Sequence, residues 1–255
     1  MSVDTDKTLV VGDVHVAPDQ NLRRATWLGR HIEATRPRRV VIIGDFLSFD
    51  SLSAWDKDKR KNMELRRYQK DVNAGSKFIE MMHKEMKPAT MENTDFIFVE
   101  GNHEDRLWRY IERDPTFDGA VDYMRDMNAP KNWKFIKYKQ SYVYRGVHFT
   151  HVPIMENGKP VSGKYVCQRA LDVYGAPIVF GHTHKFNVSA VHRKGQAHLQ
   201  MSVNVGCYFE HIDEYAQGSQ TSYWRGLVEL THYKQCGFDI NAIRMGHLKR
   251  MYGRE

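Results

Sequence analysis

Short, continuous apolar runs alternate with segments of helical periodicity in the first hundred residues. Each run is rich in β-branched or aromatic side chains and is followed by a glycine or a Glu-Gly pair, which predicts buried strands at residues 8–11, 39–43 and 95–99. Residues 19–36 and 62–87 carry apolar side chains at helical spacing, and we expect Pro37 and Pro88 to end these helices. Apolar strands separated by helices predict a parallel sheet covered by helices on both faces.

The second half of the chain consists mostly of strand-like runs. They lie at residues 142–144, 147–150, 178–180, 188–191, 199–205, 226–230 and 239–243. One helix is expected among them, near residues 162–174. This pattern predicts a second, mostly antiparallel sheet that packs on the first.

The length and composition are typical of one folded domain. The 255 residues contain no internal repeat or obvious linker, so we expect a single domain spanning residues 1–255. Apolar residues make up 41% of the chain, which is enough for a large core, yet no apolar run approaches the roughly 20 residues of a membrane helix. Two acids precede the first run, which argues against a secretory signal. We expect no membrane partner, and the sequence leaves the oligomeric state open.

The cysteines and the net charge indicate which cellular compartment and which kinds of binding partner to expect. Cys167, Cys207 and Cys236 form no CxxC pair, so neither a disulfide framework nor a thiolate zinc site is indicated. A reducing cytoplasm is the expected compartment. The formal charge of +7 favours polyanions as partners, although many basic proteins bind no nucleic acid.

Polar motifs follow five of the predicted strands. They are Asp13-x-His15, Gly44-Asp45, Gly101-Asn102-His103-Glu104, Thr150-His151 and Gly181-His182-Thr183-His184. Functional side chains gather at the carboxyl ends of the strands in such sheets. Taken singly, most of these motifs fit a structural role better, such as a turn, a helix N-cap or a satisfied buried histidine. The pair His182 and His184 is the strongest metal signal, because two imidazoles on one side of a strand rarely serve packing.

As an ordered set, the five motifs resemble those of the calcineurin-like metallophosphoesterase superfamily, from about Asp13 to His184. The resemblance implies an α/β fold, a four-layer sandwich of two mixed β-sheets flanked by helices. It implies a first metal held by Asp13, His15, Asp45 and His184. It implies a second metal held by Asp45, Asn102, His151 and His182, with Asp45 bridging the two.

The resemblance also implies how the reaction proceeds. Two divalent ions roughly 3.5–4 Å apart can share a hydroxide and hold it in line with a phosphorus atom. Oxygen and nitrogen ligands suit Mn²⁺ best, with Fe, Zn²⁺ or Ni²⁺ as alternatives. Asp45 and His103 are the expected catalytic residues, since His103 would protonate the leaving oxygen. This role requires a cationic ring, which Glu104 or Asp105 could favour.

Three positions depart from the common family pattern. Val16 follows the first histidine where glycine is frequent, and Thr150 replaces a glycine before the fourth-motif histidine. Ser48 occupies a position that is often acidic, with Asp50 two residues further on. None of these departures removes an implied ligand, so they concern the surroundings of the metals and the substrate subgroup.

The substrate class rests on features outside the motifs. The basic segment at residues 56–70 favours nucleic acid, and its alternative role is a solvated helix face. Trp55, in the loop at residues 48–55, either stacks on a base or pins that loop to the core. Arg106 either clamps phosphate or is an exposed helix charge. The loops at 153–164 and 206–222 are other candidate walls of the site.

The predicted function is metal-dependent hydrolysis of a phosphoric ester, by a phosphodiesterase or nuclease acting on DNA, RNA or nucleotides. A phosphomonoesterase acting on phosphoproteins or nucleotides is the alternative, although the GDxVDRG form of protein phosphatases is absent. A non-catalytic scaffold on the same fold is a further alternative. Such a protein would be expected to lose ligands or the proton donor, and all of these residues are present.

Overall fold

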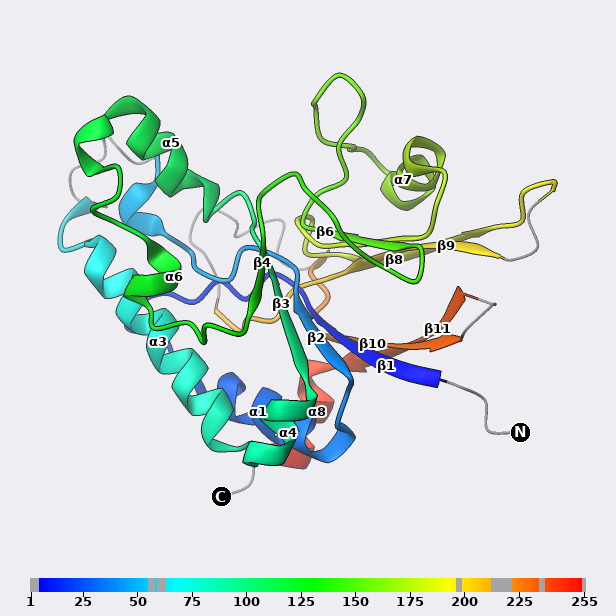
Figure 1. Ribbon diagram of the computed structural model, residues 1–255, viewed down its shortest axis with the longest axis horizontal. Helices are drawn as coiled ribbons and strands as arrows, with labels where there is room; N and C mark the ends of the chain where they lie inside the picture. The colour runs from blue at the N-terminus through cyan, green and yellow to red at the C-terminus, as the bar shows by residue number, and fades with distance from the viewer. Residues whose placement is uncertain are drawn as a thin grey trace.

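The computed structural model of the chain describes residues 5–54, 58, 63–195, 199–211, 222–233 and 237–253 (Figure 1). Two β-sheets lie face to face across the middle of the molecule, and helices lie outside each of them (Figure 1). Within the described ranges, none of the helices combines the length and the apolar character needed to cross a lipid bilayer.

The first sheet contains, in spatial order, β11 (Gly237–Arg244), β10 (Gly226–Tyr233), β1 (Thr5–Val11), β2 (Arg39–Ile42), β3 (Asp95–Val99) and β4 (Lys134–Ile136). Strands β1 to β4 run parallel, and β10 pairs antiparallel with both β1 and β11. Every residue of β2 is buried, as expected for a central strand covered on both faces. The three strands predicted in the first hundred residues are confirmed, whereas the short strand β4 was not predicted.

The second sheet contains, in spatial order, β5 (Tyr142–Tyr144), β6 (Val147–Thr150), β7 (Ile178–Phe180), β9 (Gln200–Val205) and β8 (Phe186–Val191). Strands β6, β7 and β9 run parallel, and β5 and β8 add antiparallel edges. The prediction of a mostly antiparallel sheet was wrong, because a long connection with a helix returns the chain beside β6 in the same direction. The runs at 226–230 and 239–243 form β10 and β11, which belong to the first sheet.

The helices of the described residues are α1 (Arg23–Thr35), α3 (Tyr68–Lys84), α4 (Pro88–Asn93), α5 (Asp105–Arg113), α6 (Tyr123–Asp126), α7 (Val166–Tyr174) and α8 (Met245–Tyr252), with short 3₁₀ helices η1 (Asp50–Leu52) and η2 (Pro115–Phe117). Both long helices of the first half start later than predicted, and residue 62 itself lies outside the described ranges. Pro88 does not end α3, which stops at Lys84. It begins α4 instead, where the missing N–H of proline costs nothing.

Alternate residues of β1 divide the hydrophobic core between two layers. Leu9 and Val11 belong to the cluster under helices α1, α3 and α8, whereas Val10 lies between the sheets with Val41 and Val203. A third cluster joins α7 to the outer face of the second sheet. The order from the bottom of Figure 1 to its top is therefore helices, first sheet, second sheet, helix. The predicted four-layer α/β sandwich of two mixed sheets is confirmed.

The register of the strands brings the polar motifs to one edge of the sandwich. Val11 is aligned with Ile42, and Ile42 with Phe98, so β1, β2 and β3 end at the same level. In the second sheet, Thr150 at the end of β6 is aligned with Phe180 at the end of β7. The loop after each of these strands therefore opens at the carboxyl edge, where ligand sites of such sheets form.

Candidate metal centre

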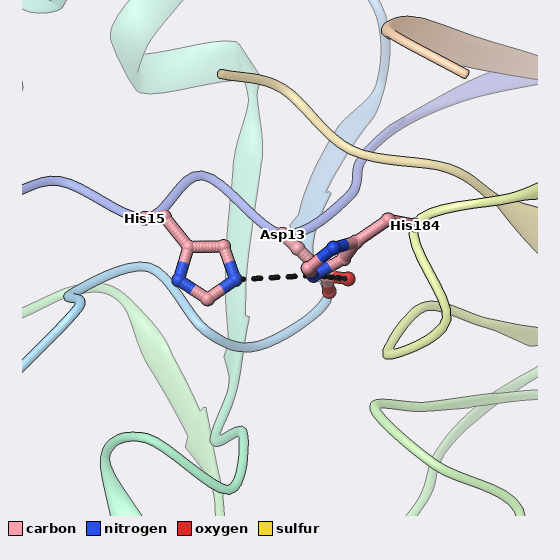
Figure 2. A group of neighbouring side chains, drawn as sticks. All are labelled: Asp13, His15 and His184. Carbon is pink, nitrogen blue, oxygen red and sulfur yellow. Dashed lines mark hydrogen bonds and ion pairs between the residues drawn. The ribbon is translucent and has the colours of Figure 1, made fainter. Parts of the chain in front are cut away.

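Asp13, His15 and His184 bring three potential ligand atoms together. Asp13 and His15 lie in the loop after β1, and His184 lies in the turn between β7 and β8. Nε2 of His184 is 3.2 Å from Nε2 of His15 and 3.2 Å from Oδ2 of Asp13. Figure 2 shows the three side chains pointing toward one another, Asp13 and His15 from the loop after β1 and His184 from the turn after β7. With Asp45, this is the ligand set that the motifs imply for the first metal.

The surroundings of this group fit a bound cation. Oδ2 of Asp13 is buried and accepts no hydrogen bond, while Oδ1 accepts one of 3.1 Å from the backbone N–H of His182. Burial lowers the pKa of His184 to about 4 and holds the pKa of His15 well below its usual range. Both rings are thus neutral at pH 7 and can offer a lone pair, the form that metals bind. A cation bound here would be coordinated at once by the free carboxylate oxygen of Asp13 and by one nitrogen atom of each ring.

A second group forms around His151, directly after β6. Nδ1 of this ring lies 2.9 Å from the carbonyl oxygen of Ile43, and because a carbonyl only accepts, Nδ1 carries the proton and Nε2 faces the site. Nε2 lies 3.0 Å from Oδ1 of Asn102 and 3.3 Å from Oδ2 of Asp45, and His182 completes the group. Burial opposes protonation of the His151 ring, but the Asp45 carboxylate outweighs burial and raises its pKa to about 10. The negative charge of Asp45 therefore stabilises a cation at the position of the His151 ring.

Asp45 lies between the two groups, shortly after β2. Its Oδ2 atom is 3.9 Å from Nε2 of His15 and 3.9 Å from Nε2 of His103, in addition to its contact with His151. Its Oδ1 atom accepts a 2.8 Å hydrogen bond from the backbone N–H of His103. Burial favours the neutral acid, but the surrounding histidine rings outweigh it and hold the pKa of Asp45 well below its usual range. An ionised carboxylate in this place can reach ions in both groups.

The backbone of the site is strained at several of these residues. Four of them adopt the left-handed conformation, with φ between +46° and +73°: His15, Asp45, His182 and His184. This conformation costs a residue with a side chain roughly 1–2 kcal/mol. Such strain persists only where the surrounding structure enforces it, and it concentrates at functional sites.

Glycines in the motifs allow the loops to approach one another. Gly44 has φ +94°, and a Cβ atom placed on it would lie 2.4 Å from Nδ1 of His151. A Cβ atom on Gly101 would lie 2.2 Å from the backbone nitrogen of Asp45 and 2.2 Å from its Oδ1 atom. The glycine of one motif thus leaves the space that the ligand of another motif occupies.

The carboxylate of Glu104 joins the second motif to the third. Its Oε2 atom accepts hydrogen bonds from the backbone N–H groups of Gly101 (2.8 Å) and Asp45 (3.0 Å). Its Oε1 atom accepts a hydrogen bond from the backbone N–H of Leu47 (2.8 Å). Burial and the charge of Asp45 raise the pKa of Glu104 to about 8, against the effect of these hydrogen bonds. Sequence reasoning missed this role. The available signal was an acid within a tight turn whose backbone N–H groups need acceptors.

The ring of His103 contacts neither of the two acids considered from the sequence, Glu104 and Asp105. Its Nδ1 atom lies 2.6 Å from the carbonyl oxygen of Ser48, and its Nε2 atom lies 3.1 Å from a guanidinium nitrogen of Arg106. Nδ1 therefore donates and Nε2 accepts, which makes the ring neutral in this arrangement. Burial lowers the pKa of His103 and Arg106 adds to the effect, while the Asp45 carboxylate opposes it.

Arg106 is anchored beside this ring rather than displayed as an exposed helix charge. Its Nη1 atom donates to the carbonyl oxygens of Ser48 (2.9 Å) and Phe49 (3.3 Å), and its side chain is 15% exposed. Asp105, the first residue of α5, pairs instead with Arg109 at 2.9 Å. The guanidinium of Arg106 thus has a defined place at the edge of the site.

The expected substrate contacts fall partly outside the described residues. Trp55 lies there, together with four residues of the basic segment at 56–70: Lys57, Lys59, Arg60 and Lys61. Arg66 and Arg67, from the same basic segment, lie just before α3. Of the loops expected to form walls, Pro160 lines a groove beside Asn102, and Ser222 lines a second pocket.

Comparison with known proteins gives one family and several similar folds. The model of the calcineurin-like phosphoesterase family matches residues 7–186. No curated protein sequence matches the chain. Nuclease MPE from Pseudomonas putida has a similar structure, with 13% identity and a TM-score of 0.37, over 89% of this chain and 84% of that one. Purple acid phosphatase PPD1 from yellow lupin (Lupinus luteus) seeds has 11% identity and a TM-score of 0.34, over 95% of this chain and 52% of that one.

The family match spans all the motifs that meet at the edge of the sandwich, from Asp13 to His184. Members of the family are metal-dependent phosphoester hydrolases that use two divalent ions, and the clustered histidines and carboxylates here are suited to such ions. The chain belongs to the calcineurin-like phosphoesterase family.

Proposed function

We propose that this protein is a two-metal phosphodiesterase that hydrolyses nucleic acid. One ion would be held by Asp13, His15, Asp45 and His184, and the other by Asp45, Asn102, His151 and His182. The place of Asp45 between the two groups supports its bridging role. The described cysteines, Cys167 and Cys207, belong to neither group, so the donors are oxygen and nitrogen atoms that suit Mn²⁺, with Fe, Zn²⁺ or Ni²⁺ as alternatives.

The residues beside the metals have separate tasks. When bound, the two ions supply a nucleophilic water and neutralise charge on the phosphoryl oxygens. The guanidinium of Arg106, held 3.1 Å from Nε2 of His103, can hold a phosphoryl oxygen next to that nitrogen. The negative charge of the phosphate favours the protonated ring, and His103 then gives its Nε2 proton to the leaving oxygen.

The observation that favours a nucleic-acid diester is a groove of about 740 Å³ that opens beside Asn102. We call it the α5 groove. Its walls carry four cationic side chains, three of them spaced along one face of α5: Arg106, Arg109, Arg113 and Lys139. Tyr110 and Tyr138 also line it and offer aromatic faces on which bases can stack.

The charge of the α5 groove suits a chain of phosphates better than a single one. Asp105 and Asp114 also line the groove, and Asp105 pairs with Arg109, so the two acids offset part of the positive charge. The cationic side chains still outnumber the acidic ones, and they extend along the groove beyond Arg106. Arg106 by itself would be sufficient to bind a single phosphoryl group. A polynucleotide presents phosphates at regular intervals along such a surface, whereas a phosphomonoester presents only one.

A substrate panel with added Mn²⁺ tests the proposal. It contains an aryl phosphodiester, an aryl phosphomonoester, single- and double-stranded DNA, RNA and cyclic nucleotides. We expect hydrolysis of the aryl diester and of polynucleotides, and loss of both activities in the Asp45→Asn variant. Faster hydrolysis of the monoester, with polynucleotides left intact, would show the protein to be a phosphomonoesterase. No hydrolysis of any ester by metal-loaded protein would favour a non-catalytic scaffold.

A further inference from the structure

A second concave site lies at the same edge of the first sheet as the metal centre. It has a volume of about 770 Å³ and is lined by the start of β8, the segment before β10, the end of β11 and the first turns of α8. Arg244 at the end of β11 is aligned with Gly226, and the next residue, Leu227, is aligned with Val11 just before the first motif. We call this site the β8–α8 recess.

The described lining of the β8–α8 recess is rich in positive charge. It includes five side chains that can be cationic: Lys185, Arg225, Arg244, His247 and Arg250. None of the described lining residues is acidic. Lys185, Arg244 and Arg250 are exposed and form no ion pair within the described part of the chain. Cations without counter-charges on a concave surface concentrate a positive potential that attracts polyanions.

Aromatic rings connect the β8–α8 recess to the first metal group. The ring of Tyr223 packs edge-on against the ring of His184, with centroids 4.6 Å apart. The backbone N–H of Trp224 donates to the carbonyl oxygen of His184 at 2.9 Å, and the Trp224 ring packs on Phe186 at 4.8 Å. Lys185 follows His184 directly in the sequence. The recess therefore begins one residue from a proposed metal ligand.

We propose that the β8–α8 recess binds one flank of a single-stranded polynucleotide whose scissile phosphate lies at the metal centre. This inference rests on the proposed function. The α5 groove opens at Asn102, in the second metal group, and the recess opens beside His184, in the first. A strand that crosses both metal positions thus has a basic surface for each of its flanks.

The chemistry of the β8–α8 recess favours a single strand over a duplex. Lysine and arginine side chains contact the phosphates of either form. The half-buried rings of Tyr223 and Phe186 can stack only with bases that are unpaired and turned outward, which a duplex does not offer.

Binding of a fluorescein-labelled oligothymidylate tests the recess. Fluorescence anisotropy is measured over a series of salt concentrations on Mn²⁺-loaded protein in a His103→Ala background, which cuts slowly. We expect the Arg244→Gln/Arg250→Gln variant to bind at least tenfold more weakly, with a salt slope lower by roughly 0.7 for each phosphate that the variant no longer neutralises. Arg244→Lys/Arg250→Lys should stay close to the parent protein, because the charges are kept.

Lys77→Gln/Lys84→Gln is the matched control, since it removes two exposed cations of α3 that line neither concave site. It should bind like the parent, and all variants with His103 intact should hydrolyse the aryl diester at the parent rate. If the Arg244→Gln/Arg250→Gln variant binds like the control while the parent protein cuts polynucleotides, the recess inference is overturned and the proposed function stands. If the parent neither binds nor cuts polynucleotides, both are overturned.

Discussion

At the scale of single residues, Ser48 has a role that its side chain does not predict. Its position is often acidic in the family, and here its backbone carbonyl, rather than a carboxylate, accepts from Nδ1 of His103. A carbonyl fixes the orientation of the ring but adds no full negative charge to favour its protonated form. In the proposed reaction, the negative charges that raise the pKa of His103 are then those of Asp45, Asp50 and the substrate phosphate.

Replacement of His103 by alanine should separate proton donation from metal binding. We expect turnover of an alkyl phosphodiester to fall by about 10²–10⁴-fold, the usual contribution of a general acid. The decrease should be smaller for a p-nitrophenyl diester, whose leaving group needs little protonation. Steady-state rates for the two substrates, with metal content measured in parallel, check this expectation.

Metal content is the critical control, because Nε2 of His103 also lies near His15 and Asp45 in a group that could hold an ion. A His103→Ala protein that retains two ions per chain supports the proton-donor role. Loss of one ion, with equal rate decreases for both leaving groups, would make His103 a ligand instead.

The proximity of several site residues could be predicted, because each motif follows a strand that is itself easy to recognise. His184 lies beside Asp13, and His151 lies beside Asp45, as expected. The contacts that Glu104 and Arg106 make across the site could not be predicted, because most of their partners are backbone groups of the loop after β2. The path of that loop depends on tertiary packing, and no pattern in the local sequence encodes it.

At the scale of elements, the turn after each strand determines how closely its neighbours approach. Gly44→Ala tests this for the second metal group. The added Cβ would overlap Nδ1 of His151, so we expect the Ile43 carbonyl to lose its hydrogen bond and the protein to bind about one ion fewer. Elemental analysis after Mn²⁺ loading and desalting measures the stoichiometry.

Gly158→Ala is the matched control, because Gly158 also has a positive φ (+76°) but no atom within 4 Å of an added Cβ. Both variants carry the backbone strain of alanine in this conformation, roughly 1–2 kcal/mol. Only Gly44→Ala should lose metal. Equal metal content in the two variants would mean that the backbone at residue 44 can shift to accommodate the added Cβ atom without displacing His151.

Helices and strands could be predicted where the residues of the element itself carry the pattern that identifies it. The continuous apolar run at residues 95–99 is β3 without adjustment. β10 was assigned to the wrong sheet because its partner, β1, lies at the other end of the sequence, as in the pair Val11 and Leu227. Pairings between such distant segments depend on the whole fold, and the alternation of apolar residues is compatible with either sheet.

At the scale of the whole molecule, His232 connects the two sheets through a buried neutral ring. Its Nε2 atom lies 3.0 Å from Oγ1 of Thr8 on β1, and its ring packs edge-on against Tyr144 of the second sheet, with centroids 5.3 Å apart. Burial lowers the pKa of His232 to about 4, although Asp6 opposes the shift. The folded protein therefore resists the proton that the unfolded chain accepts below a pH of about 6.5.

This difference should make the fold sensitive to acid. Between pH 6.5 and 4 the unfolded state binds more protons at His232 than the folded state, so stability falls as the pH falls through this range. The His232→Gln variant keeps a polar partner for Thr8 but has no ionisable group at position 232. We expect its urea midpoint to fall less than that of the unmodified protein between pH 7 and pH 5.

Urea unfolding of both metal-free proteins at several pH values gives the comparison, because the other histidines contribute equally to both. Parallel decreases of the two midpoints would show that the proton on His232 has no part in acid unfolding.

The proposed ligands come from both halves of the sandwich: those from Asp13 to Asn102 follow strands of the first sheet, and His151, His182 and His184 follow strands of the second. Ions held in this way bind only when the two sheets are packed together. By mass action, a ligand bound only by the native state at one hundred times its Kd adds about 2.7 kcal/mol to folding. That is a large part of the roughly 5–15 kcal/mol that keeps a typical domain folded. In a cell short of the metal, the unfolded fraction would then rise about a hundredfold, so the amount of the protein would fall as well as its activity.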